Sequence, residues 1–360
     1  MKKLSVTRRA RLSFIVASLL ATSCTAVSEK HLLLFPVQKV QDCFRAEEMA
    51  VDKVFPGSFD LTGFAVLNDK LVVTAMYGSD YCLDVVDVTS GEVLYGACRI
   101  GRGPGEFLGL SPLFSTTNES VVVYDLGTGI LSEVSIDGSM TDRVIHQVKL
   151  EASSGQSIPI ILSSHIVREK EILAFNSIQA PSEYVSIATP YYAVYDYETG
   201  SEKRTICPFD ATPLAHSSEW VTMTAFDLRD CVNSENTSIC FVMGKMPVFG
   251  FIDIASGKVR GFRLNGEPAF STSENRLYFT GICARDQFIY ALYLGTTEGE
   301  LDPERSKTFL YKLDWDGHIL KKYELDGVYR GCYATSNELY LSKAESDLSW
   351  GLYQVDIKML

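Results

Sequence analysis

The side chains in this chain that could perform acid–base, metal or nucleophilic chemistry match no familiar catalytic spacing. None of the five histidines stands in an HExxH pattern, which places two zinc ligands on one helical turn. The sequence contains no GxSxG motif for a serine nucleophile and no P-loop for a nucleotide phosphate. We therefore expect no catalytic residues, no metal site and no cofactor. The histidines are His31, His146, His165, His216 and His318.

A base, an acid and an aromatic side chain are grouped within residues 216–220. Trp220 could stack on a sugar ring while Glu219 and His216 bond its hydroxyls, and binding residues concentrate in long connections of this kind. A solvated loop anchored by one tryptophan is the simpler interpretation. We keep His216, Glu219 and Trp220 as candidate ligand-binding residues.

A second candidate site is the glycine-rich segment of residues 101–107, which reads Gly-Arg-Gly-Pro-Gly-Glu-Phe. Exposed backbone N–H groups together with Arg102 could hold a carboxylate or phosphate, with Glu106 beside them. The structural alternative is a fixed turn that clasps two neighbouring units, with Phe107 packed between them. The turn and packing chemistry of every residue favours the clasp, and Arg102 and Glu106 remain candidate ligand contacts.

The amino-terminal segment has the form of a secretory signal peptide. Five basic residues precede a short apolar run, and Leu-Ala-Thr-Ser-Cys follows at residues 20–24. The small residues before Cys24 resemble the lipobox of bacterial lipoproteins, although Ala21 stands where that motif usually has leucine. The resemblance implies that residues 1–23 are removed and that Cys24 is lipidated. We expect residues 24–38 to form a lipidated tether and possible closing strand, followed by one domain over residues 39–360.

The charge and the cysteines restrict the partners further. Removal of residues 1–23 takes away five basic and no acidic residues, which changes the net charge from −12 to −17 and disfavours nucleic acid as a partner. No CxxC spacing occurs among the eight remaining cysteines. We expect mostly free, buried thiols, and the pairs closest in sequence within strand patterns are Cys231 with Cys240 and Cys82 with Cys98.

The body of the chain repeats six times. Polar turns precede apolar or alternating runs, which is typical of β-hairpins, and their middle residues lie 50, 50, 67, 50 and 51 residues apart. A second turn type, with Asp followed by Gly, falls between them, as at Asp87 and Gly91. Two hairpin turns per unit give four strands. The middle residues of the first turn type are Asp69, Glu119, Glu169, Asn236, Asp286 and Asn337.

Four-stranded units repeated in a ring predict an all-β fold, a six-bladed β-propeller of four-stranded antiparallel blades. The sixth unit has sequence for only three strands before the chain stops at Leu360. An open strand edge promotes aggregation, so an amino-terminal strand should complete the last blade. We expect residues 31–40 to supply this strand, with residues 49–55 as the alternative.

Taken with the lipobox, the loop at residues 101–107 connects the chain to a known family. This loop, with Pro112 after it, resembles the interblade loop of NHL-type propellers. Together with Cys24 it is similar to the TolB-like six-bladed propeller lipoproteins of gut-dwelling Gram-negative bacteria. The resemblance implies an exported, lipid-anchored propeller, and it supplies no catalytic residues.

Two classes of function follow. The first is a non-enzymatic binding or scaffold module that sits as a monomer on the periplasmic side of the outer membrane and binds an envelope protein, a peptide or a glycan. The second is an enzyme, either a glycan hydrolase or lyase or an ester or lactone hydrolase, with its site at the mouth of the channel. The second class requires acidic or histidine side chains that converge there with shifted pKa values.

Overall fold

The structure is a computed structural model that describes most of the chain from residue 27 onward. Residues 1–23 and the expected lipidation site Cys24 lie outside the described residues. Among the described residues, no helix is both long and apolar enough to cross a membrane. The described residues are 27–54, 60–75, 78–111, 115–116, 120–136, 144–151, 159–167, 170–177, 189–215, 217, 221, 224–268, 270–271, 274–345 and 349–360.

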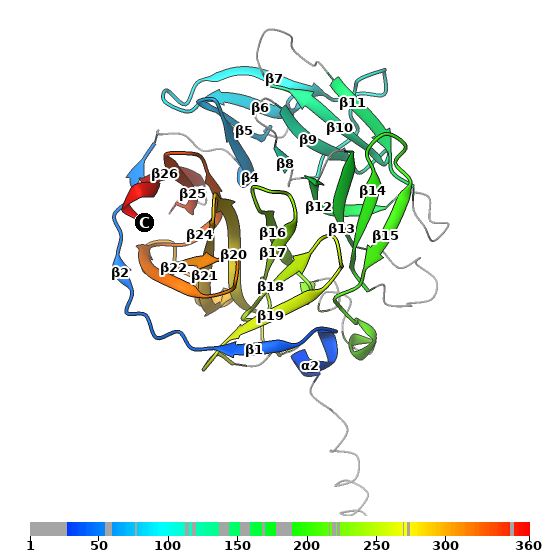
Figure 1. Cartoon of the computed structure of the whole chain (residues 1–360). Helices are drawn as coiled ribbons and strands as arrows, with labels where there is room; N and C mark the ends of the chain where they lie inside the picture. Colours follow the sequence, from blue (N-terminus) through cyan, green and yellow to red (C-terminus); the bar gives the residue numbers. More distant parts are fainter. Residues whose placement is uncertain are drawn as a thin grey trace, which may run out of the picture.

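Six sheets, each built from antiparallel strands with a parallel edge strand added in blades 4 and 5, surround a central axis and form the predicted six-bladed β-propeller (Figure 1). Within each blade the chain runs from the inner strand outward. The first three blades have four strands each. Their bounds are β4 Asp60–Leu67, β5 Lys70–Thr74, β6 Tyr81–Asp87 and β7 Val93–Arg99 in blade 1; β8 Ser115–Thr116, β9 Ser120–Asp125, β10 Ile130–Ser135 and β11 Val144–Lys149 in blade 2; and β12 Ile160–Val167, β13 Glu171–Ser177, β14 Tyr191–Asp196 and β15 Glu202–Ile206 in blade 3.

The last three blades each gain a strand from the amino-terminal segment. Four short helical turns lie outside the sheets. The strand bounds are β16 Leu228–Val232, β17 Ser238–Met243, β18 Val248–Asp253, β19 Val259–Leu264 and β1 Val37–Val40 in blade 4; β20 Arg276–Arg285, β21 Phe288–Thr297, β22 Lys307–Asp314, β23 Ile319–Asp326 and β2 Glu47–Glu48 in blade 5; and β24 Tyr329–Ala334, β25 Glu338–Ala344, β26 Trp350–Asp356 and β3 Asp52–Lys53 in blade 6. The helical turns are α2 Glu29–Leu32, η1 Thr212–Leu214, η2 Glu298–Glu300 and η3 Ile357–Met359.

The two turn types join the strands at the places that the sequence predicted. Asn68 and Asp69 connect β4 to β5 with φ of 46° and 64°, the left-handed conformation of a tight hairpin turn. Asp87 connects β6 to β7, and its Oδ1 accepts hydrogen bonds from the N–H groups of Thr89 and Ser90. Both turn types lie at the same end of the ring because strands alternate in direction within a blade.

Blade 6 is completed by a strand from residues 49–55, which the sequence analysis gave as the alternative. The prediction that residues 31–40 complete it was wrong. β3, within residues 49–55, pairs antiparallel with β26 as the outer strand of blade 6. Residues 31–40 instead place β1 parallel to β19 on the outer edge of blade 4. The reason is burial: Leu32 and Phe35 pack into the core between blades 3 and 4, which fixes this segment one third of the ring away from blade 6.

The amino-terminal strap, defined here as residues 27–54, runs around the outside of blades 4, 5 and 6 (Figure 1). Near its start, the carboxylate of Glu29 accepts hydrogen bonds from Nε of Arg263 at 2.8 Å and from the N–H of Phe270 at 2.9 Å. Further along, Asp42 bonds the Tyr311 hydroxyl on blade 5 at 2.6 Å. The strap therefore combines edge pairing with buried ion pairs and ties three blades together.

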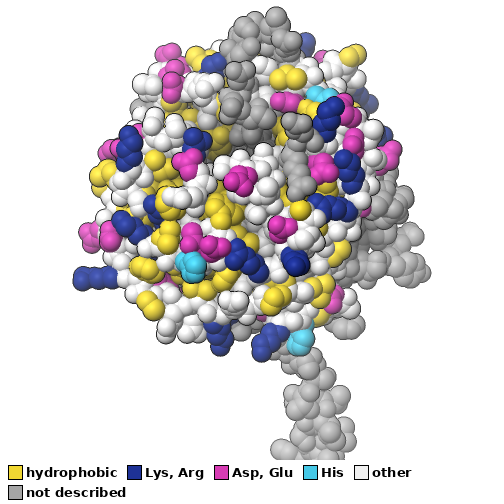
Figure 2. Space-filling model, viewed as in Figure 1, with side chains coloured by type: hydrophobic (Ala, Val, Ile, Leu, Met, Phe, Trp, Pro, Cys, Tyr) yellow, Lys and Arg dark blue, Asp and Glu magenta, His cyan; other side chains and the backbone are white. Residues whose placement is uncertain are grey.

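Apolar side chains fill the space between adjacent blades. One buried cluster joins Leu71 and Val86 of blade 1 to Tyr340 and Leu352 of blade 6, so the ring closes through packing as well as through strand pairing. Equivalent clusters occupy the other interfaces, including a large aromatic one between blades 4 and 5. On the face shown in Figure 2, basic and acidic side chains are interspersed rather than gathered into one field of a single sign.

Replacing Glu29 with alanine should destabilise the protein by about 3 kcal/mol, because the Arg263 guanidinium, only 15% exposed, would lose its counter-ion. The matched control is Lys53→Ala, which removes the strap's ion pair with Glu345 and, at 42% exposure for Lys53, should cost less than about 1 kcal/mol. Urea unfolding monitored by tryptophan fluorescence measures both. Equal losses in the two variants would show that the buried end of the strap contributes no special stability.

Candidate ligand site in the central channel

A cavity of about 1090 Å³ occupies the central channel and opens between the hairpin turns of the inner strands. Its described walls come from β4, β12, β16, β20 and β24, the inner strands of five blades (Figure 1). Its rim carries turn residues such as Asn68, Asn236 and Asp286. A cavity of this volume accommodates a small molecule or an extended peptide segment. The channel is therefore the candidate functional site.

The carboxylate of Asp230 on β16 lies at this wall and is held by three side-chain contacts. Its side chain is 1% exposed. Oδ2 accepts hydrogen bonds from the Ser163 hydroxyl at 2.8 Å and the Tyr192 hydroxyl at 2.9 Å, and Oδ1 lies 2.9 Å from Nε2 of His165. Because three of these residues belong to blade 3 and Asp230 to blade 4, the network fastens two blades together at the channel.

The electrostatic balance keeps Asp230 ionised. Burial by itself raises the pKa of this carboxyl, but the charge and hydrogen bond of His165, with the two hydroxyl donors, outweigh burial, so the net pKa lies below the usual 3.8. Burial, followed by the nearby Asp230, raises the pKa of Tyr192 well above 10, which leaves that phenol a neutral donor. An ionised, fully hydrogen-bonded carboxylate holds its neighbours in place and is a poor general acid.

Ser163, His165 and Asp230 are of the residue types that form a hydrolase triad, but the hydrogen bonds between them follow a different pattern. In a nucleophilic triad the serine donates to the histidine, and the histidine is oriented by the acid. Here both the Ser163 hydroxyl and His165 bond directly to Asp230. No described contact places His165 against the Ser163 hydroxyl. This arrangement positions polar groups along the wall and does not activate a serine.

The channel wall also carries three cysteines, Cys231, Cys283 and Cys332. All eight cysteines of the described chain are free, including Cys231 and Cys240, which face each other across β16 and β17, and the pair Cys82 and Cys98. Burial raises the pKa of the thiols of Cys231 and Cys283 well above 9.0. Both thiols therefore stay protonated at neutral pH, and a protonated thiol is a weak nucleophile.

The glycine-rich loop lies outside this cavity, and the N–H groups of Gly101, Gly103 and Glu106 donate hydrogen bonds within the loop. The Glu106 carboxylate accepts a hydrogen bond from the Gly103 N–H at 2.6 Å, while Arg102 is exposed. Phe107 is 2% exposed and packs between blades 1 and 2. A Cβ at Gly101 would lie 2.0 Å from the Glu106 carboxylate, so any larger residue there would displace this side chain. The geometry supports the interblade clasp.

The structure leaves one group of sequence candidates untested. His216, Glu219 and Trp220 lie outside the described residues. The sequence analysis missed His165 and Asp230. One signal could have indicated Asp230: it follows Arg229 inside the otherwise apolar strand Leu-Arg-Asp-Cys-Val, where charged side chains are costly to bury without partners.

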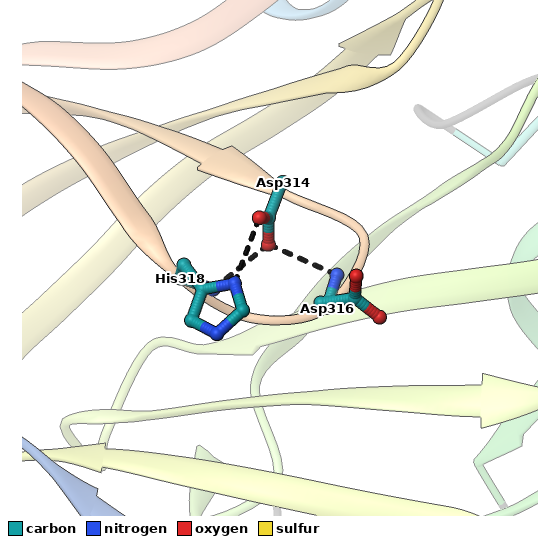
Figure 3. A group of neighbouring side chains, drawn as sticks. All are labelled: Asp314, Asp316 and His318. Carbon is teal, nitrogen blue, oxygen red and sulfur yellow. Dashed lines mark hydrogen bonds and ion pairs between the residues drawn. The ribbon is translucent and has the colours of Figure 1, made fainter.

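A smaller group of ligand-type side chains lies on the turn between β22 and β23 (Figure 3). Asp314 Oδ1 accepts hydrogen bonds from the N–H groups of Asp316 and His318, and its Oδ2 lies 2.8 Å from Nδ1 of His318. The bond to Asp314 and its charge raise the pKa of His318 above 6.5. These contacts are those of a turn that satisfies its own polar groups, and we assign the cluster that role.

Comparisons with known proteins support the fold. No family model matches the sequence. No curated protein matches it either. Among solved structures, the chain is similar to a member of the DUF4221 family from Bacteroides vulgatus, with a TM-score of 0.57 and 15% identity over 91% of this chain and 96% of that one. Regucalcin, a calcium-binding protein from Agrobacterium tumefaciens, gives a TM-score of 0.48 and 9% identity over 86% and 94% of the two chains. At these identities the similarity describes the fold alone.

Replacing Asp230 with asparagine should destabilise the protein by about 3–5 kcal/mol, because an amide offers only one acceptor to three donors and breaks a buried pair. The native carboxylate contributes stability above its unfolded pKa of 3.8, and this contribution is lost as the pH falls through its lower folded pKa. The difference in the free energy of unfolding between the wild type and Asp230→Asn should therefore become smaller at acidic pH.

Urea unfolding at several pH values measures this difference. Asp316→Asn, at a side chain 80% exposed, is the control and should change stability by less than about 0.5 kcal/mol. A pH-independent difference between the wild type and Asp230→Asn would contradict the proposed ionisation.

Proposed function

We propose that this protein is a lipid-anchored, cell-envelope binding module whose ligand occupies the central channel. The observation that carries the proposal is the cavity of about 1090 Å³, whose lining includes polar side chains such as Ser163, His165 and Asn236. Asp230 at its wall bonds three side chains of blade 3 and so links blades 3 and 4. A rigid wall with fixed donors and acceptors suits recognition of a peptide or glycan.

The alternative, a hydrolase or lyase at the channel mouth, receives less support from the same residues. The Ser163 hydroxyl and His165 both bond Asp230 instead of each other. The pKa of Asp230 is lowered, whereas a general acid active near neutral pH needs a raised one. The buried cysteine thiols of the wall are kept protonated by burial, which raises their pKa. The binding function requires none of this chemistry.

The membrane part of the proposal rests on the sequence around Cys24 and on the resemblance to TolB-like propeller lipoproteins. Val27 packs against the core between blades 3 and 4, and only two residues separate it in sequence from Cys24. A lipid on Cys24 would thus hold blades 3 and 4 close to the bilayer. We place the anchor in the outer membrane and the propeller on its periplasmic side, as a monomer.

Cys24→Ser should prevent lipidation, so the variant should move from the membrane fraction to the soluble fraction and lose incorporation of labelled palmitate. Cys43→Ser, which removes an exposed thiol of the strap, is the matched control and should remain in the membrane fraction. Membrane retention of the Cys24→Ser protein would remove the anchoring proposal.

The channel function is tested by narrowing its mouth. Ser234 and Ser336 are exposed rim residues that line the cavity, and their joint replacement by tryptophan should reduce ligand capture at least tenfold. Glu235→Trp is the control, since Glu235 is exposed beside Ser234 but does not line the cavity. Capture from envelope extract is quantified by mass spectrometry of bound peptides and glycans. Equal capture by the double variant and the control would place binding elsewhere.

A further inference from the structure

Two arginines line the cavity far from its rim of hairpin turns. Arg229 is the second residue of β16 and Arg330 is the second residue of β24. The inner strands of all blades run in the same direction along the axis, so the first residues of these strands lie at one end of the channel. Positive charge is thus concentrated at the end opposite the rim.

Arg330 has no counter-ion among the described residues. In the described part of the chain it makes no hydrogen bond and no ion pair, and its Nε atom is buried without a partner. The guanidinium carbon of Arg330 lies 6.0 Å from the centroid of the Trp350 ring. The Arg330 side chain is half-buried and lines the channel, so its guanidinium offers N–H donors that no described residue accepts.

Arg229 retains donors that the protein does not use. One of its nitrogens bonds Asp227 and the carbonyl of Leu228, whereas a guanidinium carries five N–H donors. Lys245 adds a third cation at the same end. Its Nζ bonds the Asn275 side chain, and it lies close enough to Arg330 for the two charges to repel.

Two acids partly offset these cations and are themselves engaged. Asp227 pairs with Arg229, and Glu298 accepts a hydrogen bond from Asn275. Neither contacts Arg330 among the described residues. Arg276, the first residue of β20, also lies at this end and pairs with Glu274. The described residues named here thus give four cations and three acids, a small excess of positive charge in a chain whose net charge is −12.

We propose that this end of the channel, with Arg330 as its principal contact and Arg229 beside it, binds an oxyanion group of the ligand, such as a carboxylate, sulfate or phosphate. Guanidinium groups hold such oxyanions through paired, charge-assisted hydrogen bonds. The inference deepens the proposed channel-binding function and rests on it. It narrows the ligand to acidic glycans or peptides with an acidic group that reaches past the rim.

The test measures binding of four probes at constant ionic strength by calorimetry and by shifts in melting temperature. The probes are inorganic sulfate, inorganic phosphate, glucuronate and neutral glucose. The wild-type protein should bind at least one of the three anions at millimolar or lower concentration, and glucose no better than background. Which anion binds most tightly separates carboxylate from sulfate or phosphate ligands. Absence of anion binding, or binding only in the molar range, overturns the inference.

Arg330→Gln should weaken anion binding at least tenfold, and Arg330→Lys should retain part of it. Arg305→Gln is the matched control, because Arg305 is 88% exposed and lies away from the cavity lining. The ligand-free Arg330→Gln protein should be about as stable as wild type, since Arg330 makes no hydrogen bond or ion pair with a described residue. That result distinguishes lost recognition from misfolding, and unchanged anion affinity in Arg330→Gln overturns the inference.

Failure of this inference can be told apart from failure of the channel function. If the rim variant at Ser234 and Ser336 loses ligand capture while Arg330→Gln captures normally, the channel binds a ligand without an oxyanion at this end. In that case the proposed function stands and the oxyanion site is wrong. If capture survives the rim variant, the channel function itself is wrong.

Discussion

Closure of the ring is the constraint on which the rest of the structure depends. Blade 6 has three strands of its own, and β3 supplies the fourth through pairing with β26. An unfilled edge would expose N–H and C=O groups and weaken the apolar packing between blades 6 and 1. The strap that carries β3 also covers the outer edges of blades 4 and 5, so one amino-terminal segment stabilises half of the ring.

A closed ring brings the inner strands together, and this makes the channel a site. Asp230 illustrates the consequence, because its carboxylate receives donors from the neighbouring blade and is buried at the channel wall. The hydrogen bonds of this network make the wall rigid. They also engage the Ser163 hydroxyl and His165 with Asp230, so these groups are not arranged for catalysis. A rigid polar wall is the property that the proposed binding function needs.

The two ends of the channel differ in chemistry. The rim consists of hairpin turns rich in Asn and Asp, whereas the opposite end holds Arg229 and the unpartnered Arg330. This polarity would orient an elongated ligand with its acidic group inward. This difference between the two ends is consistent with the proposed envelope binding module, whose anchoring at Cys24 is part of the same proposal.

The sequence by itself determined the repeat and its strand order, because turn chemistry is encoded within a few residues, as at Asn68, Asp69 and Asp87. It did not determine which segment closes the ring, since β3 has only two residues and carries no pattern of its own. Nor could it bring His165 to Asp230, which lie 65 residues apart. Only the tertiary structure decided these contacts, because they depend on how neighbouring blades pack around the axis.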